Sequence, residues 1–229
     1  TIRVDRFMAL DFWSTATAFE LVTLPLFILM GEILFQTKLS ENLFAGLAPW
    51  VRRLPGRLTH VNVLGSTIFA AVSGSSAATT ATVGRITLPE LTKLGYNKSF
   101  VAGALAGSGT IGFLIPPSIP LIVYGVLAEV SILKLFMAGI IPGLILALLF
   151  MIYIGVRATI SPELAPSTSD STTMLFKLKS LLKLLPTFLL ISFVVGSMYA
   201  GFASVTEAAA IGVLGATILA ASDRRLNVK

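Results

Sequence analysis

The sequence predicts an all-α protein that crosses a membrane several times. Of its 229 residues, 55% are apolar and only 12% are charged, and the mean hydropathy is +0.90. Because a soluble domain carries about 25% charged residues, most of this chain is expected to lie in lipid. Two of its apolar stretches carry glycines, prolines or hydroxyl side chains at their centres. These interruptions predict a re-entrant helical hairpin and a broken helix.

The first segment, residues 1–59, is expected to hold one scaffold span and an interfacial arm helix. An apolar run over residues 19–36 is just long enough to cross a hydrocarbon core of about 30 Å. Residues 38–59 repeat apolar side chains at helical spacing and end in three arginines that follow Trp50. This combination is typical of a helix that lies at the membrane surface.

Residues 60–128 form the next predicted unit, a transport-domain hairpin and broken helix. The stretch 60–94 has a hydroxyl-rich centre, SGSSAATTAT, and is long for a single crossing. We interpret it as two half-helices that meet at residues 73–76 and return to the same side of the membrane. Such a hairpin is tolerated only where protein shields it or where it lines a cavity.

A second interruption, GSGTIGFLIPPS, lies within the apolar stretch 99–128. Pro116 and Pro117 cannot donate backbone hydrogen bonds, and the residue before each proline is pushed out of helical geometry. The helix is therefore expected to open near residues 112–117, which leaves backbone groups unpaired unless something binds them. Hydroxyl and carbonyl oxygens together would suit an alkali cation, and half-helix ends would favour an ion or an anionic substrate.

The rest of the chain predicts one span in residues 129–157, a cytoplasmic linker in 158–184 and two further spans in 185–229. With the hairpin re-entrant, most lysines and arginines between the apolar segments fall on one side. Positive charge is enriched in cytoplasmic loops, so this layout predicts a multi-pass protein of the bacterial inner membrane. Because the chain begins with Thr1 rather than Met, we expect it to be a segment of a longer polypeptide.

Four long motifs give the chain a family resemblance: PLFILMGEILFQTKLSENLF, STIFAAVSGSSAATTATVGRITLPEL, GSGTIGFLIPPSIPLIVYGVLAEVSILKLFMAGIIPG and GFASVTEAAAIGV. In this order they closely resemble the large permease subunit, the DctM or M type, of tripartite ATP-independent periplasmic (TRAP) transporters. The resemblance covers nearly the whole chain. It implies one half of an elevator-type ion transporter, with a sodium-driven symport of an organic acid such as a dicarboxylate.

The resemblance also implies partners. A periplasmic substrate-binding protein would deliver the organic-acid substrate, and a small membrane subunit of the Q type would brace the scaffold within the lipid bilayer. Family members contain two related halves, each with a hairpin and a broken helix, and only the first pair is visible in this sequence.

The candidate site residues lie at the two interruptions. The hairpin tip supplies four candidate sodium ligands, which are Ser73, Gly74, Ser75 and Ser76. The resemblance adds Gly107 and Thr110 as sodium contacts through carbonyl and hydroxyl oxygen. The surrounding hairpin and helix-break region, expected near the substrate, comprises Thr79, Ser108, Gly109, Gly112, Pro116 and Pro117. A plainer interpretation stays open, because small residues can simply let helices approach closely and prolines can simply kink a helix.

Charged side chains at membrane depth also call for interpretation, because they are costly there. Arg85 could bind a substrate carboxylate, or it could be an interfacial or salt-bridged arginine with Glu90 as its partner. Glu207 fits a capping box with Ser204 better than it fits a proton relay. Glu32, inside the first span, is expected to contact the scaffold or a partner subunit.

Composition argues against several other functions. The absence of cysteine and the single histidine exclude thiolate and multi-histidine metal sites. No nucleophile–base pair accompanies the serines of the SGSS motif, so we do not expect an enzyme. The net charge of +6 lies mainly between apolar segments and predicts no nucleic-acid binding. The competing hypothesis is a proton-coupled carrier or a channel with re-entrant loops from another ion-transporter family.

Overall fold

A computed structural model describes residues 4–166 and 173–223, and every regular element in this part of the chain is a helix. Four helical runs are long and apolar enough to cross a membrane, and only 22–28% of their most apolar windows is buried. Their outward surfaces are therefore suited to lipid, and the predicted all-α, multi-pass fold is confirmed. Parts of the predicted segments 1–59, 158–184 and 185–229 lie outside the described residues. The four runs are Phe7–Phe35, Ile132–Ile160, Met174–Tyr199 and Val205–Ser222.

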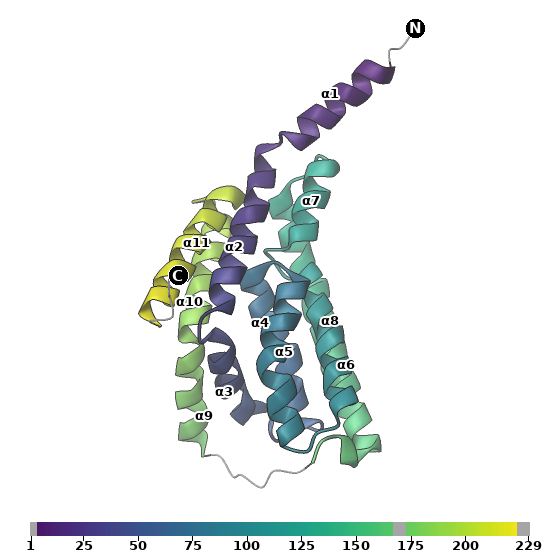
Figure 1. The fold of residues 1–229 in the computed structure, drawn as a ribbon, viewed down its shortest axis with the longest axis vertical. Coiled ribbons are helices and arrows are strands. Elements are labelled where there is room, and N and C mark those ends of the chain that lie inside the picture. Colours follow the sequence, from purple (N-terminus) through teal and green to yellow (C-terminus); the bar gives the residue numbers. More distant parts are fainter. Residues whose placement is uncertain (1–3, 167–172, 224–229) are drawn as a thin grey trace.

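The first apolar run begins earlier than the predicted residue 19. Helix α1 (Val4–Ala16) precedes a short 3-10 turn, η1 (Phe19–Val22), and helix α2 (Thr23–Phe35). Figure 1 shows α1 projecting away from the other helices, and α2 running at an angle to it into the body of the molecule. Asp5 and Asp11 dilute the apolar character of α1, which is why hydropathy pointed to a later start.

Helix α3 (Leu39–Val51) is the amphipathic element that was expected at the membrane surface. It packs between α4 and α9. The Ser180 hydroxyl donates to the Gly46 carbonyl over 3.0 Å, and the Trp50 indole N–H donates to the Lys177 carbonyl over 3.2 Å. A 3-10 turn, η2 (Arg57–Thr59), then leads into the hairpin.

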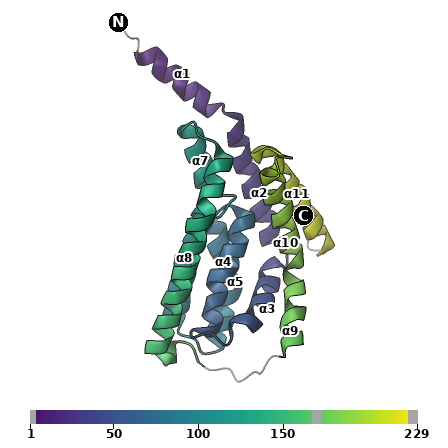
Figure 2. The same ribbon diagram turned by 180° about the vertical axis from the view of Figure 1, so that it is seen from behind.

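The stretch 60–94 folds as a hairpin of α4 (His60–Ser73) and α5 (Ser76–Lys93). The two helices run side by side in both views (Figures 1 and 2). Their outer ends lie together, because the backbone N–H of Leu58 donates to the Tyr96 hydroxyl over 3.3 Å. The chain therefore returns to the side from which it came, as a re-entrant element does.

The stretch 99–128 is an interrupted helix, as the prolines predicted. Helix α6 (Lys98–Gly109) ends in the 3-10 turn η3 (Thr110–Phe113), and α7 (Ile119–Leu127) begins after five further residues. Helix α6 packs against both arms of the hairpin. Asn62 on α4 donates its side-chain amide to the Val101 carbonyl of α6 over 3.2 Å.

The remaining helices flank this central unit on two sides. Figure 2 shows α8 running along one side of the hairpin and α9, α10 and α11 on the other. Much of the segment expected as a linker is helical, since α8 continues to residue 160, η4 follows it, and α9 leads through η5 directly into α10. The bounds are α8 (Ile132–Ile160), η4 (Pro162–Leu164), α9 (Met174–Leu181), η5 (Leu182–Leu184), α10 (Leu185–Tyr199) and α11 (Val205–Ser222).

Helix α11 is fastened to α2 and begins with a capping box. The Ser204 hydroxyl accepts from the Glu207 backbone N–H, and the Glu207 carboxylate accepts from the Ser204 backbone N–H over 2.7 Å. The capping interpretation of Glu207 is therefore confirmed. The hydroxyl of Thr23 at the start of α2 lies 2.8 Å from the hydroxyl of Thr206 on α11, and this hydrogen bond joins the two helices.

Candidate functional site

The hairpin tip is built around one left-handed glycine. Helix α4 ends at Ser73, and Gly74 has a φ of +63°, which glycine adopts without strain. A side chain at Gly74 would also crowd the Pro117 carbonyl, which lies 3.0 Å from the position of its Cβ. Ser75 then starts α5, because its hydroxyl accepts from the backbone N–H of Ala78 over 3.3 Å. The tip therefore has no room for a larger residue at position 74.

Two fully buried hydroxyls join the arms of the hairpin just below the tip. The Ser73 and Thr79 hydroxyl oxygens lie 2.9 Å apart, and the backbone N–H of Ser75 points to the Ser73 hydroxyl over 3.4 Å. Polar groups without water need such partners. Ser73 and Thr79 therefore hold the tip together internally.

The helix break is stabilised by local side-chain bonds as well. The Thr110 hydroxyl donates to the Gly107 carbonyl over 2.7 Å, and the Ser118 hydroxyl donates to the Phe113 carbonyl over 2.8 Å. Pro116 and Pro117 are buried and joined by a cis peptide bond. The opened backbone thus keeps several of its carbonyl groups bonded across the interruption.

The hairpin tip and the helix break lie in direct contact. The Ser76 hydroxyl donates to the Gly109 carbonyl over 2.7 Å, and the backbone N–H of Ile119 donates to the Gly74 carbonyl over 3.1 Å. Gly112 packs so closely on the tip that a Cβ added there would lie 3.1 Å from the Ser76 Cα atom. The two interruptions found in the sequence therefore form one structural unit.

Three of the expected site residues point elsewhere. Gly107 faces α8, where a Cβ would lie 2.9 Å from the ring of Phe150, and the Thr110 side chain is exposed. The Ser108 hydroxyl lies 3.2 Å from the Ser66 hydroxyl, at the buried interface of α6 with α4. The structure therefore brings Ser73, Gly74, Ser75, Ser76, Thr79, Gly109, Gly112, Pro116 and Pro117 together, while Gly107, Ser108 and Thr110 flank them.

Residues that the sequence analysis did not single out complete this unit. Ile119 supplies the backbone donor to Gly74, and Thr80 approaches Gly109 so closely that no side chain fits there. The pattern of Ser118 followed by Pro120 indicates that a helix starts at Ile119, but it does not indicate the contact with Gly74.

An open cleft of about 640 Å³ lies where the tip meets the break. Its lining includes three residues with hydroxyl groups, Ser75, Ser76 and Thr80, and three apolar residues, Phe113, Ile119 and Pro120. Among the described residues, no group of three or more histidine, cysteine or carboxylate side chains could hold a metal ion. A cation at this site would therefore be bound by hydroxyl and carbonyl oxygens, which suit hard ions.

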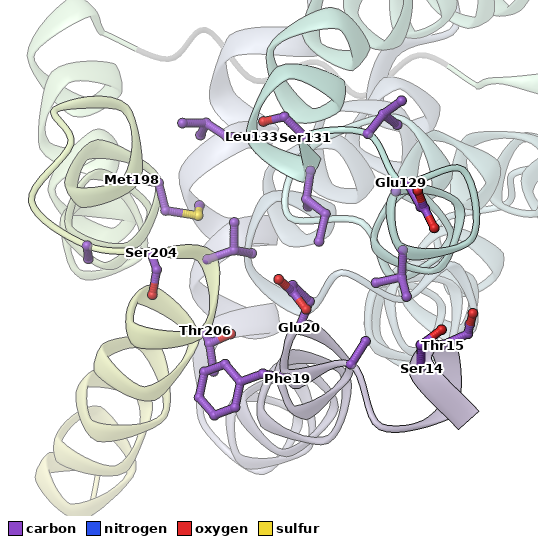
Figure 3. A pocket seen from close by; sticks show the side chains of 17 residues that line it. Ser14, Thr15, Phe19, Glu20, Glu129, Ser131, Leu133, Met198, Ser204 and Thr206 are labelled. Carbon is purple, nitrogen blue, oxygen red and sulfur yellow. The ribbon is translucent and has the colours of Figure 1, made fainter. Parts of the chain in front are cut away.

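A second cavity of about 690 Å³ lies at the end of α7 that is remote from the helix break, between the η1, α7–α8 and α10–α11 segments. Figure 3 shows Glu20 and Glu129 on its walls, with Ser204 and Thr206 nearby. None of the expected site residues lines this cavity.

Comparison with known proteins decides the family. The family model described as "Tripartite ATP-independent periplasmic transporter, DctM component" matches residues 1–229. The chain belongs to the DctM family. This membership agrees with the resemblance found in the four motifs.

Curated DctM relatives are similar over most of this chain. The C4-dicarboxylate TRAP transporter large permease protein DctM of Pseudomonas aeruginosa is 34% identical over 215 residues, which is 94% of this chain and 50% of that protein. The sialic acid TRAP transporter large permease protein SiaM of Vibrio cholerae is 33% identical over 203 residues, 88% of this chain and 46% of that protein. The ectoine/5-hydroxyectoine large permease protein UehC of Ruegeria pomeroyi is 34% identical over 203 residues, 87% of this chain and 46% of that protein. The chain thus spans about half the length of these relatives.

Proposed function

We propose that this protein is part of the membrane permease of a TRAP transporter that takes up an organic acid together with sodium ions. The observation that carries the proposal is the direct contact between hairpin tip and helix break, made by the Ser76–Gly109 and Gly74–Ile119 hydrogen bonds. Discontinuous elements that meet within the membrane form the binding sites of many secondary transporters. Membership of the DctM family supports the same function.

Sodium is expected to bind at the hairpin tip. The carbonyl oxygens of Gly74 and Gly109 each accept a hydrogen bond, and a carbonyl oxygen has a second lone pair available for a cation. Ser73, Ser75 and Ser76 add further hydroxyl and backbone oxygens. Gly107 and Thr110 would contribute from the flank of the break, where their oxygens already lie 2.7 Å apart.

The transported solute is expected to be an organic acid. Relatives are named for C4-dicarboxylate and sialic acid, and others for ectoine, which supports a small polar solute rather than a macromolecule. The helix-break region, with Gly109, Gly112 and Pro117 at its centre, would shape the path beside the cleft. A carboxylate would be favoured there by half-helix ends that point toward the interruption.

The partners are expected to be a periplasmic substrate-binding protein and a small membrane subunit in the bacterial inner membrane. A relative from Oleidesulfovibrio alaskensis carries the combined name "Isethionate TRAP transporter permease protein DctMQ" and is 40% identical over 141 residues, 62% of this chain and 22% of that protein. This name supports a Q-type partner. The permease itself is expected to have no enzymatic activity, in line with the transporter names of the relatives.

The transport step is expected to be an elevator movement of the hairpin unit, α4 to α7, against the flanking spans. Gly31 on α2 packs against Ser73 at the tip, where a Cβ would lie 3.2 Å from the Ser73 Cβ. A glycine at this contact presents a smooth surface, which would favour sliding. By contrast, α2 is held to α11 by the bond between Thr23 and Thr206.

Uptake by the reconstituted system tests this function. The full-length permease, its small subunit and its binding protein would be placed in proteoliposomes with a candidate dicarboxylate or sialic acid outside. We expect uptake only with an inward sodium gradient and only with the binding protein present. Uptake that continues when choline replaces sodium, driven by a proton gradient, would instead favour the proton-coupled alternative.

A further inference from the structure

Glu32 is an exposed carboxylate at the depth of the hairpin tip. It lies within the membrane-spanning run Phe7–Phe35, and its neighbour Gly31 packs directly on Ser73. An ionisable side chain at this depth is costly unless it is paired, and it marks a functional position by default. Among the residues that the structure describes, none forms a hydrogen bond or ion pair with Glu32.

Arg85 on α5 is a charged side chain of the hairpin that contacts α2. Its guanidinium carbon lies 5.3 Å from the centroid of the Phe35 ring, which is a cation–π distance. This contact stabilises the cation but does not neutralise it. Glu90 was named as a possible partner of Arg85, but in the described part of the chain it accepts from Lys93 over 3.1 Å.

Glu32 and Phe35 lie on the same face of α2, because residues three apart are neighbours on a helix. The rise between them is about 4.5 Å. A movement of the hairpin along α2 by about one helical turn, toward the α1 end, would therefore carry the Arg85 guanidinium from the Phe35 ring to the Glu32 carboxylate.

We propose that Glu32 and Arg85 form a membrane-embedded ion pair in a second position of the hairpin, and that Arg85 rests on Phe35 in the position described here. The inference depends on the proposed function in one respect, namely that the hairpin unit moves against α2. Both residues are positioning residues, since neither lies at the tip–break contact. The exchange keeps a favourable partner beside Arg85 throughout the movement, and the ion pair stabilises the second position.

Charge substitutions test the pair in the reconstituted full-length system. Glu32→Gln and Arg85→Gln each leave one charge at depth without its partner, so each is expected to lower the uptake rate at least about tenfold. The swapped variant, Glu32→Arg with Arg85→Glu, is expected to recover uptake to within about threefold of the unmodified permease. Glu90→Gln is the matched control, because the exposed pair with Lys93 contributes little. A swap no more active than the single variants would overturn the proposal.

Cysteine cross-linking tests the geometry without depending on transport. The described half has no cysteine of its own, so paired cysteines can be placed in a cysteine-free full-length permease in membranes. Phe35→Cys with Arg85→Cys, and Glu32→Cys with Arg85→Cys, are both expected to react with a short bismaleimide. Adding sodium or substrate should raise the cross-linking yield of one cysteine pair and lower the cross-linking yield of the other. If the 35–85 pair reacts and the 32–85 pair never does, the proposal is wrong. Sodium-dependent uptake by the unmodified permease would then still stand as support for the proposed function.

Discussion

The hairpin unit and the span beside it, α8, differ in what they bury. The tip and break bury hydroxyl side chains and prolines beside their apolar residues, whereas every buried residue of α8 is small or apolar. The hydroxyls and prolines are Ser73, Thr79, Pro116, Pro117 and Ser118, and the buried residues of α8 include Phe136, Gly139, Gly143, Ala147 and Ile154.

This difference follows from how each element forms the hydrogen bonds of its backbone N–H and C=O groups. A continuous helix pairs most of its N–H and C=O groups internally, so α8 can be largely apolar even with Pro142 inside it. The hairpin tip and the helix break lack some of these helical hydrogen bonds. Side-chain bonds replace them, such as those from the Ser76 hydroxyl to the Gly109 carbonyl and from the Ser118 hydroxyl to the Phe113 carbonyl. Substitutions at the tip and the break should therefore be more harmful than substitutions at the exposed positions of α8.

The largest effect is expected from Gly112→Val. A Cβ at this position lies 3.1 Å from the Ser76 Cα atom, so the valine would push the break away from the tip. We expect a loss of about 1–3 kcal/mol in the free energy of unfolding and loss of sodium-driven uptake. Gly103→Val in α6 is the control, because no atom lies within 4 Å of its Cβ position. Equal uptake by the two variants would contradict the tight contact.

Ser73→Ala should have the next largest effect. It removes the partner of the Thr79 hydroxyl, which is fully buried, at a cost of about 1–3 kcal/mol. Chemical denaturation of the detergent-solubilised full-length permease would measure it. The double variant Ser73→Ala with Thr79→Val should be more stable than Ser73→Ala alone, because no hydroxyl is then left unpaired. If adding Thr79→Val lowers the stability further, loss of the bond between Ser73 and Thr79 does not explain the effect of Ser73→Ala.

The sequence predicted the location of both interruptions but not the direction of every side chain near them. The SGSS and Pro-Pro motifs break helices for local reasons, so the hairpin and the opened helix could be predicted from them. Ser108 turns toward Ser66, and Thr110 turns outward, because these directions depend on where α6 ends and how it packs against α4 and α8. Such tertiary packing leaves no mark in a single sequence.

For the charged residues too, local patterns could be predicted from the sequence and contacts between distant helices could not. The capping box of Glu207 is a local pattern and was predictable. The contact of Arg85 with Phe35 joins α5 to α2 across fifty residues of sequence, whereas Glu90, the possible local partner, pairs with Lys93. Helix α1 was missed because its two aspartates lower the mean hydropathy of an otherwise apolar stretch.

Ser204→Ala should have a smaller effect that is confined to stability. It removes the N-cap of α11 and should lower the free energy of unfolding by about 1 kcal/mol. The sodium concentration for half-maximal uptake should be unchanged, because Ser204 lies away from the hairpin tip. A shift in that concentration would show that α11 influences the ion site.

Ile141→Ala on α8 should have the smallest effect. Ile141 is 68% exposed on the outer surface of this span, so its truncation should change stability by less than about 0.5 kcal/mol. Thermal unfolding in detergent would measure it alongside Ser73→Ala. A loss as large as that of Ser73→Ala would contradict the contrast between the two regions.

The most direct test of the central claim is the sodium dependence of thermal unfolding for the purified full-length permease. If the hairpin tip and the helix break together hold a cation, sodium should raise the unfolding temperature in a saturable way, and potassium or choline at equal ionic strength should not. The rise should disappear in Gly112→Val and persist in Gly103→Val. Equal stabilisation by all three cations, or a full sodium effect in Gly112→Val, would contradict the account.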